Sequence, residues 1–498
     1  MPKNTKFSSN DRTFFNLVAR AAFCNPFSTE RTELDLRIAE CPAGTSDEEC
    51  LDKIIVKVRD RVERLARNGS ADLRLYPAED RGDLQAAFLF DIFHRLMDRF
   101  DTLIQEQIRS GRDLCPVPFS GEALGMFAER GFSIPESIRF FAMLYQIRRA
   151  FYFIHQGLTG SSPSMRQLRL HLWNNVFTHD IRWYEQYLWN RMEDFSTLLL
   201  GETGTGKGTA AAAIGRSGFI PYDEKKGCFS ESFTRNFIAI NLSQFAETLI
   251  ESELFGHRKG AFTGAVEGHQ GIFSRCTPHG SIFLDEIGDI SVPIQVKLLQ
   301  VLQDRTFTPV GSHEQLRFSG RVIAATNRRI DDLHRKGRFR EDLFYRLCSD
   351  VIIVPSLRQR LQEDPEELEK MIAHVMGRII GEESNELAAM VRGVIEDGLG
   401  PDYQWPGNVR ELEQAVRRIL LTKRIGHDLG VEDFARDGAP CLLSRIEDNP
   451  MSAEELLEKY CGLLYEKFGT YEEVSRRVRL DRRTVKKYIL KSQKHGQD

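Results

Sequence analysis

A glycine-rich loop that ends in a lysine is the part of the sequence with the clearest chemistry. It reads Gly-Glu-Thr-Gly-Thr-Gly-Lys over residues 201–207, follows the apolar run 197–200 and precedes an alanine-rich stretch. Between a strand and a helix, such glycines let backbone N–H groups converge on phosphates, while the lysine supplies a point charge for the outer ones. A glycine-rich loop alone can be a simple turn, but this lysine and these flanks predict a nucleotide-binding P-loop. The residues expected to contact the nucleotide are Gly201, Glu202, Thr203, Gly204, Thr205, Gly206, Lys207, Gly208 and Thr209.

Two adjacent carboxylates follow a second apolar run, 281–284, and are the candidates for nucleotide hydrolysis. The position after the P-loop lysine, where Ser or Thr usually holds magnesium, is Gly208, so we expect Asp285 to hold Mg2+, with Thr209 as the next available hydroxyl. Glu286 is then expected to orient and deprotonate the attacking water. Two solvated acids at a strand end are the alternative, but the P-loop upstream favours the hydrolytic role.

The elements that must position these residues alternate in the pattern of a parallel sheet with crossover helices. Polar loops or helical patterns separate short apolar runs across residues 158–356, and a helical segment follows from about residue 357 to residue 422. The sequence therefore predicts an α/β core with a helical subdomain behind it. The apolar runs are 197–200, 237–240, 281–284 and 321–325.

The region before residue 157 has helical patterns and no recognisable chemistry. Asp83 can cap an apolar helix that stops at Gly111, and a second apolar helix is expected from about Pro135 to His155. Such apolar stripes are far more often core faces than cofactor sites. We find no nucleotide loop, metal-ligand spacing or phosphate-accepting acidic cluster here. We therefore expect a mostly helical regulatory domain whose signal is not readable.

The composition, 41% hydrophobic and 28% charged, is that of a folded soluble protein. No stretch approaches the roughly 18 apolar residues of a membrane-spanning helix, and the start lacks a signal peptide's apolar core, so the chain is expected to be cytoplasmic with no membrane partner. The nine cysteines include no CxxC pair, which favours reduced thiols. A metal site is a weaker alternative, built from Cys24, Cys41, Cys50 and Cys115.

The segment 253–265 carries the most specific resemblance. It resembles the bacterial enhancer-binding proteins, the AAA+ activators of sigma-54 RNA polymerase, whose hallmark is Gly-Ala-Phe-Thr-Gly-Ala. The resemblance covers about residues 158–425 and implies an AAA+ fold with a helical lid. Phe262 would be an exposed apolar anchor between flexible glycines, although a buried core phenylalanine is the alternative. The loop expected to contact sigma-54 is Gly260, Ala261, Phe262, Thr263, Gly264 and Ala265.

The resemblance also implies roles for five further residues. Asn241 matches the asparagine that couples the catalytic glutamate to the loop, and Asn327 matches the first sensor, which reads the γ-phosphate. Arg340 and Arg346 match the arginine fingers given to a neighbouring subunit's ATP, and Arg410 matches the second sensor in the lid. Any one arginine could instead be a surface salt bridge. Together they imply ATP and Mg2+ as cofactors, sigma-54 and RNA polymerase as partners, and a homo-oligomeric ring, by resemblance a hexamer.

Residues 474–489 resemble the Fis-like helix-turn-helix at the carboxyl terminus of this family. From Tyr471 to Asp498 nine Lys or Arg face four Asp or Glu, a net charge of +5. Thr470 with Glu473 predicts a capping box for the first helix, and Asp481 can cap the second. Basic helical hairpins are often merely solvated, but fusion to this ATPase favours DNA binding. The expected DNA contacts are Arg482, Arg483, Thr484, Lys486 and Lys487.

Two residues and one segment depart from the family pattern. Gly208 stands where the family has glutamate, the segment 215–235 is long, and Arg479 replaces the turn glycine of the helix-turn-helix. They put in question the hydrolysis rate, the surface near the P-loop helix and the turn geometry.

The sequence thus predicts a sigma-54-dependent activator that binds enhancer DNA and uses ATP to convert the closed polymerase complex into the open one. A DNA-bound repressor or sensor that uses ATP only for assembly is one alternative, and an AAA+ remodeller of another protein is a second. The expected domains are a regulatory region 1–156, an ATPase subdomain 157–356, a lid 357–425, a linker 426–449 and a helix-turn-helix 450–498.

Overall fold

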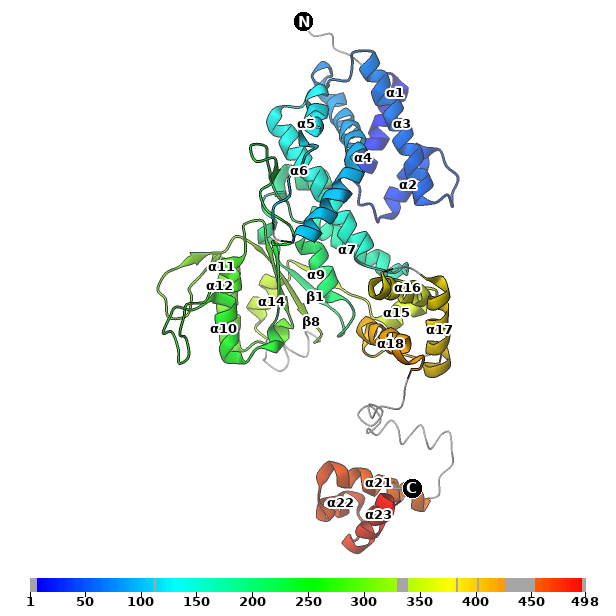
Figure 1. The fold of residues 1–498 in the computed structure, drawn as a ribbon, viewed down its shortest axis with the longest axis vertical. Coiled ribbons are helices and arrows are strands. Elements are labelled where there is room, and N and C mark those ends of the chain that lie inside the picture. The colour runs from blue at the N-terminus through cyan, green and yellow to red at the C-terminus, as the bar shows by residue number, and fades with distance from the viewer. Residues whose placement is uncertain are drawn as a thin grey trace. The chain divides into compact units, whose positions relative to one another are not determined.

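The computed structural model describes residues 7–111, 113–328, 339–381, 384–400, 403–425 and 453–494. The described residues up to Leu420 form one compact unit, and those from Leu421 onward form a second (Figure 1). The linker predicted at 426–449 lies outside the described residues. Among the helices that the structure describes, none is long and apolar enough to cross a membrane.

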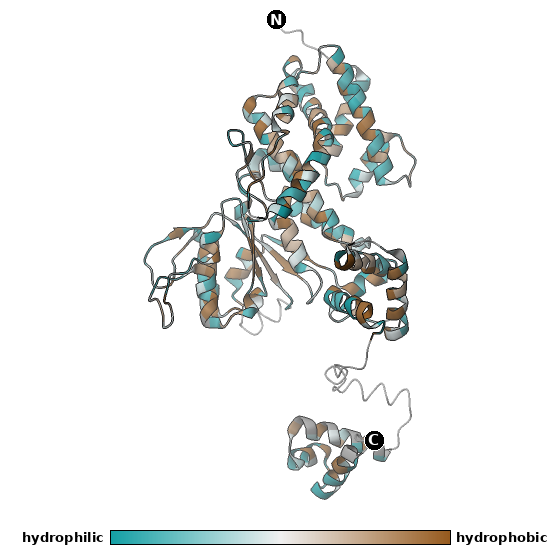
Figure 2. Cartoon of the chain, in the orientation of Figure 1, coloured by the Kyte–Doolittle hydropathy of each residue, from teal (hydrophilic) through white to brown (hydrophobic). Residues whose placement is uncertain are grey.

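The amino-terminal region is helical, as predicted, and its helices carry hydrophobic and hydrophilic residues along their lengths (Figure 2). The predicted start of the long helix α4 at Asp83 is wrong, because the helix begins at Ala78 after Pro77, with Glu79 and Asp80 in its first turn. Its predicted end is confirmed at Gly111. The region comprises α1 (Ser9–Phe23), α2 (Thr29–Ala39), α3 (Asp47–Arg67), α4 (Ala78–Ser110), α5 (Ser120–Glu129) and α6 (Ile134–Phe151), and α7 (Pro163–Phe177) follows it.

A five-stranded sheet forms the centre of the first unit, with strand order β4-β5-β8-β1-β9 and parallel pairing throughout. The four predicted apolar runs are strands of this sheet, which confirms the α/β class. The fifth strand, β9, lies at an edge and is only half-buried, so its sequence lacks the same apolar signal. The strands are β1 (Thr197–Leu200), β4 (Phe237–Asn241), β5 (Ser281–Asp285), β8 (Arg321–Thr326) and β9 (Asp350–Ile353).

Helices cover both faces of the sheet, which explains the continuous apolar strands. Alternate residues of β1 enter different cores: Leu198 packs with the helices α10 (Glu247–Phe255), α12 (Val292–Asp304) and α14 (Glu341–Leu347), whereas Leu199 packs with α9 (Lys207–Gly215). The core that contains Leu199 continues from α9 into the amino-terminal helices. The amino-terminal region and this face of the sheet therefore share one hydrophobic core.

The long segment 215–235 forms a short antiparallel hairpin of β2 (Tyr222–Asp223) and β3 (Cys228–Phe229). Its aromatic rings pack on α6: the centroids of Tyr222 and Phe141 are 5.0 Å apart, and those of Phe229 and Tyr145 are 4.4 Å apart. The extra length therefore joins the amino-terminal helices to the segment that follows α9.

The predicted helical lid consists of α15 (Leu357–Glu363), α16 (Glu367–Ile380), α17 (Asn385–Leu399) and α18 (Asn408–Thr422). A buried ion pair between Arg360 and Glu367 joins its first two helices. Glu367 also accepts backbone N–H groups from Ser161 and Ser162, at 3.1 and 2.7 Å. The lid is thereby tied to the segment that precedes α7.

The second unit contains α21 (Ala453–Phe468), α22 (Tyr471–Val478) and α23 (Arg482–Lys494). The predicted Asp481 cap is confirmed, since its carboxylate accepts the backbone N–H groups of Arg483 and Thr484. The predicted capping box is wrong, because Thr470 makes no side-chain cap bond and Glu473 pairs with arginines of its own helix. A small core joins the helices through Cys461, Val474, Val485 and Ile489.

Candidate active site

The P-loop joins the carboxyl end of β1 to the amino end of α9. Gly204 and Gly206 have φ angles of 80° and 101°, which side chains disfavour. Lys207 is buried, and its Nζ donates to the carbonyl oxygens of Gly201 and Glu202 at 2.9 and 3.0 Å. Burial lowers the pKa of Lys207, and the nearby carboxylates Asp285 and Glu286 oppose this shift. A polyanionic ligand in the loop would therefore stabilise the charged lysine.

The two carboxylates lie at the end of β5, beside the P-loop. Asn241 stands opposite Asp285 in the sheet, and its Nδ2 donates to Asp285 Oδ2 at 3.4 Å. Glu286 has a left-handed backbone, with φ of 57°, and its Oε2 accepts the backbone N–H of Asn327 at 3.3 Å. The Asn327 amide donates in turn to Thr203 Oγ1 at 2.8 Å. The structure thus joins Asn327 to both Glu286 and the P-loop, but places Asn241 against Asp285 rather than Glu286.

The lid contacts the P-loop directly at the start of α18. The Asn408 amide donates to the Thr203 carbonyl at 3.0 Å, and the Val409 N–H donates to the Gly204 carbonyl at 3.0 Å. Arg410 follows on the exposed side of this turn and contributes to lowering the pKa of Lys207. Asn408 stands two residues before the predicted sensor Arg410, but nothing in its local sequence indicates its contact with the P-loop.

A cavity of about 100 Å³ opens between the P-loop, the lid and the segment around α7. Thr209 lines it, and no hydrogen bond joins Thr209 to Asp285 in the part of the chain that the structure describes. The predicted metal pair therefore stays a prediction. The cavity was not foreseen, because its apolar walls come from segments far apart in sequence: Leu158, Met165, Leu168, Met371 and Val375.

The two predicted arginine fingers are exposed, and each bonds a group outside the P-loop. Arg340 pairs with Asp342, with Nε 3.0 Å from Oδ1. Arg346 donates to the Leu302 carbonyl at the end of α12, at 3.0 and 2.8 Å. Within the described ranges, neither guanidinium bonds a P-loop residue or the carboxylates after β5.

The loop 260–265 projects from a base formed by His257, whose backbone pairs with His269. Gly260 and Gly264 have φ angles of 81° and 100°, and the Gly260 N–H donates to the Ala265 carbonyl at 2.8 Å. Phe262 is 39% exposed and touches the ring of His257, which confirms that it is not a core residue. The loop presents an apolar side chain on a closed, glycine-flanked turn.

The basic residues of α23 are exposed, as expected for a solvent-facing or nucleic-acid-binding surface: Arg482, Arg483, Lys486 and Lys487. Thr484 is half-buried and bonds Asp481, so its hydroxyl acts in the helix cap. Arg479, in place of the turn glycine, has a left-handed φ of 55°. In the described part of the chain, no group of three or more His, Cys, Asp or Glu residues could hold a metal ion.

The sheet order, the P-loop, the carboxylates at the end of the neighbouring strand and the helical lid define an AAA+ P-loop protein. The Sigma-54 interaction domain matches residues 182–352. Over 292 residues, which are 56% of this chain and 71% of the relative, the sequence is 37% identical to the sigma54-dependent transcriptional activator SfnR of Pseudomonas putida. The chain belongs to the family of sigma-54-dependent transcriptional activators.

Some relatives are covered over a smaller part of their length. The Nif-specific regulatory protein of Klebsiella pneumoniae is 39% identical over 271 residues, which cover 54% of this chain and 45% of that protein. The chain thus spans about half the length of such relatives. A crystal structure of NtrX from Brucella abortus is similar with a TM-score of 0.41 and 20% identity, over 75% of this chain and 79% of that one.

Proposed function

We propose that this chain is an ATP-driven activator of sigma-54 RNA polymerase. One observation carries the proposal: Lys207, Glu286 and Asn327 converge beside the P-loop, in a chain that also presents the exposed loop 260–265. The first feature suits phosphate chemistry, and the second suits transfer of its result to a partner. Membership of the family supports the combination.

The residues at the site fit a nucleotide with its magnesium ion. Bound ATP and Mg2+ would supply a γ-phosphoryl group whose charge the metal helps to neutralise. Lys207 would exchange its two carbonyl partners for phosphate oxygens, and Asp285 would hold the metal. Glu286, held toward the P-loop by Asn327, would orient and deprotonate the attacking water. The apolar cavity beside Thr209 would take the base.

Assembly into a ring, by family resemblance a hexamer, would complete each nucleotide site. Arg340 and Arg346 are exposed and make no bond to their own P-loop within the described residues. A neighbouring chain could present them to a γ-phosphate, where a fixed guanidinium fork best meets developing charge.

The second unit would hold the chain on DNA upstream of the promoter. Its exposed basic residues on α23 suit phosphate and base-edge contacts, and Asp481 fixes the start of that helix. ATP hydrolysis would then move the loop 260–265 against sigma-54, and the polymerase would open its promoter.

The test of this function is the variant Thr263→Ala, measured for ATP turnover and for open-complex formation with sigma-54 polymerase. Thr263 lies on the loop that has its base at His257, not in the P-loop, so phosphate contacts should be unaffected. We expect normal ATP turnover and DNA binding, with open-complex formation reduced about five- to thirtyfold, because loss of about one to two kcal/mol at a small contact changes its occupancy by this factor.

Two results would favour the alternatives. Normal open-complex formation by Thr263→Ala would show that this side chain is not part of the transducer, and a remodeller of another target would gain support. A parent protein that binds its promoter but hydrolyses no ATP would support the repressor or sensor.

A further inference from the structure

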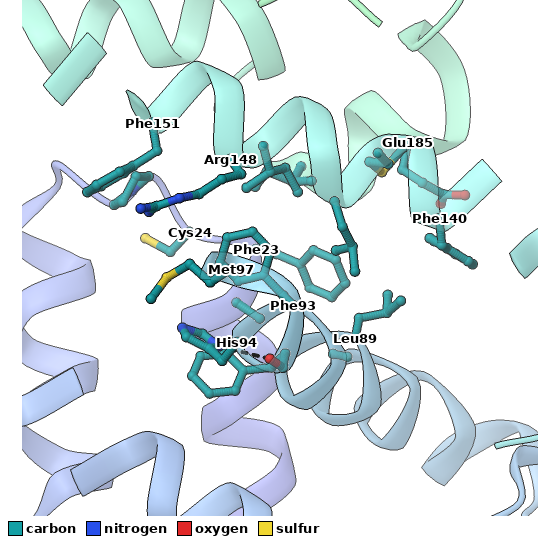
Figure 3. Close-up of a pocket in the computed structure, with 18 of the residues that line it drawn as sticks. Phe23, Cys24, Leu89, Phe93, His94, Met97, Phe140, Arg148, Phe151 and Glu185 are labelled. Carbon is teal, nitrogen blue, oxygen red and sulfur yellow. Dashed lines mark hydrogen bonds between the residues drawn. The ribbon is translucent and has the colours of Figure 1, made fainter. Parts of the chain in front are cut away.

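A cavity of about 210 Å³ lies among the amino-terminal helices, away from the P-loop (Figure 3). Its walls come from the end of α1, from α4 and α6, and from Trp173 on α7. Most of the lining is apolar, and aromatic rings are frequent, including Phe23, Phe93 and Phe140. An apolar cavity of about 150 Å³ is enough to admit benzene. This cavity therefore has the size and lining for a small aromatic molecule.

The charged side chains at the wall already have partners. Arg31 pairs with Asp35, with Nε 2.9 Å from Oδ1, and Arg148 pairs with Asp101, with Nε 2.6 Å from Oδ1. Glu185 forms an ion pair with Arg139, with Oε1 2.6 Å from Nη2. A charged ligand would have to displace one of these pairs or leave its own charge buried, which is costly. The walls thus favour a neutral ligand.

His94 supplies the polar feature that could orient such a ligand. Its Nδ1–H donates to the Phe90 carbonyl at 2.8 Å, which leaves the lone pair of Nε2 as an acceptor. No hydrogen bond to Nε2 is found among the residues described. Burial lowers the pKa of His94 to about 4, so the ring is neutral at physiological pH. In Figure 3, His94, Met97 and Cys24 lie toward one side of the pocket and Phe140 toward the other.

From this lining we propose that the cavity binds a neutral, planar aromatic molecule that carries one hydrogen-bond donor, which His94 Nε2 accepts. The apolar walls supply contact area, and the acceptor on His94 selects for a ligand with a donor. This ligand class is independent of the nucleotide proposed for the P-loop.

Helix α6 connects this cavity to the nucleotide site. One side of α6 lines the cavity with Leu144 and Ile147. From the same helix, the Gln146 amide donates to the Ser217 carbonyl at 2.9 Å, and Arg149 donates to the Gly218 carbonyl at 2.6 Å. Both carbonyls directly follow α9, whose first residue is the P-loop lysine. A ligand that shifts α6 would therefore act on the P-loop helix, a coupling that rests on the proposed ATPase function.

The binding test uses calorimetry on the full chain with indole as the probe. Indene has the same shape without the N–H donor, and indole-3-carboxylate adds a charge. We expect indole to bind with one site per chain, indene to bind about three- to tenfold more weakly, and indole-3-carboxylate to give no measurable binding. Absence of indole binding to the folded chain, or equal affinity for indole and indene, would overturn the proposal.

Two variants and one matched control locate the site. Leu89→Trp fills the cavity from α4 and should abolish indole binding, whereas His94→Phe should bind indole and indene equally. Ile108→Phe alters an exposed residue of the same helix and should bind indole like the parent. Circular dichroism checks folding, and if Leu89→Trp does not fold, His94→Phe still decides the site. Parent-like preference for indole in His94→Phe would refute it.

The coupling has its own readout. With indole at saturation, ATP turnover of the parent should change at least twofold, in either direction, while Leu89→Trp should not respond. Unchanged turnover in an active parent would overturn the coupling through α6. A chain without ATPase activity would instead count against the proposed function, and the calorimetry would still decide the cavity.

Discussion

Lys207 and Glu286 lie close together, but we expect substitutions of them to affect different quantities: nucleotide affinity for Lys207 and turnover for Glu286. Lys207 is buried and satisfied by two carbonyl oxygens, whereas Glu286 is fixed by the backbone of Asn327. Lys207→Ala should lose nucleotide affinity at least tenfold, because the outer phosphates lose a charged partner. Glu286→Gln should bind ATP and lower turnover about 100-fold or more, because the amide cannot accept the proton of the attacking water. Equilibrium binding and steady-state turnover separate the two, and parent-like ATP affinity in Lys207→Ala would refute the site.

His94 makes folding stability depend on pH. Its pKa of about 4 in the folded chain lies below the ordinary value of 6.5, so the unfolded chain binds more protons between these limits. Stability contributed by neutral His94 is present above about pH 6.5 and is lost as pH falls toward 4, by at most about 1.4 kcal/mol per pH unit. Denaturant midpoints at several pH values should fall less steeply for His94→Gln than for the parent. Equal slopes would contradict the assignment.

At the scale of elements, the sequence predicted those strands and loops that are determined by their own neighbouring residues. The inner strands β1, β5 and β8 are buried on both faces, so their apolar runs were unambiguous, and the P-loop follows from its own residues. The start of α4 was missed because Asp83 is a residue type that often caps a helix. In the structure its Oδ2 does not cap α4 but accepts a hydrogen bond from Asn16 Nδ2 on α1, at 3.1 Å. Such tertiary partners cannot be read from spacing.

Features assembled from distant segments were not predictable for the same reason. The contact of Asn408 with the P-loop spans about two hundred residues of chain, and the aromatic cavity needs several helices to close. Segment 215–235 was identified only as long. Its packing on α6 depends on the rings of Tyr222 and Phe229 meeting a helix far upstream.

The junction between P-loop and lid can be tested at a single glycine. Gly204 has a positive φ, and a Cβ there would collide with the Gly407 carbonyl at the start of the lid helix α18. Gly204→Ala should therefore displace the lid and lower nucleotide affinity about tenfold or more. Gly381→Ala is the matched control, since this glycine at the end of the lid helix α16 also has a positive φ, 86°, but nothing lies within 4 Å of a Cβ placed there. Nucleotide titrations that find Gly204→Ala equal to Gly381→Ala would contradict this junction.

At the scale of the whole molecule, the proposed phosphate site would need groups from two chains. Within one chain, Asp285, Glu286 and Arg410 lie near enough to Lys207 to influence its pKa. Arg340 and Arg346 instead bond Asp342 and the Leu302 carbonyl. If these arginines complete the site of a neighbouring chain, the defect of an arginine variant lies at a different interface from the defect of a P-loop variant.

This separation makes a mixing experiment decisive. Arg340→Ala or Arg346→Ala alone should lower ATP turnover at least tenfold, and Lys207→Ala alone should lower it through lost nucleotide binding. In a mixed ring, the intact P-loop of an arginine variant can face the intact arginine of a Lys207→Ala chain, so turnover should recover in part and peak near equal proportions. Mixing Arg340→Ala with Arg346→Ala is the control, because both defects then lie on the donated side and no fully intact site can form. Subunit exchange is verified by native mass spectrometry of rings formed from mass-labelled and unlabelled chains. With exchange verified, no recovery at any ratio would mean that the arginines act within their own chain or only support its structure, and the ring proposed here would lose its chemical basis.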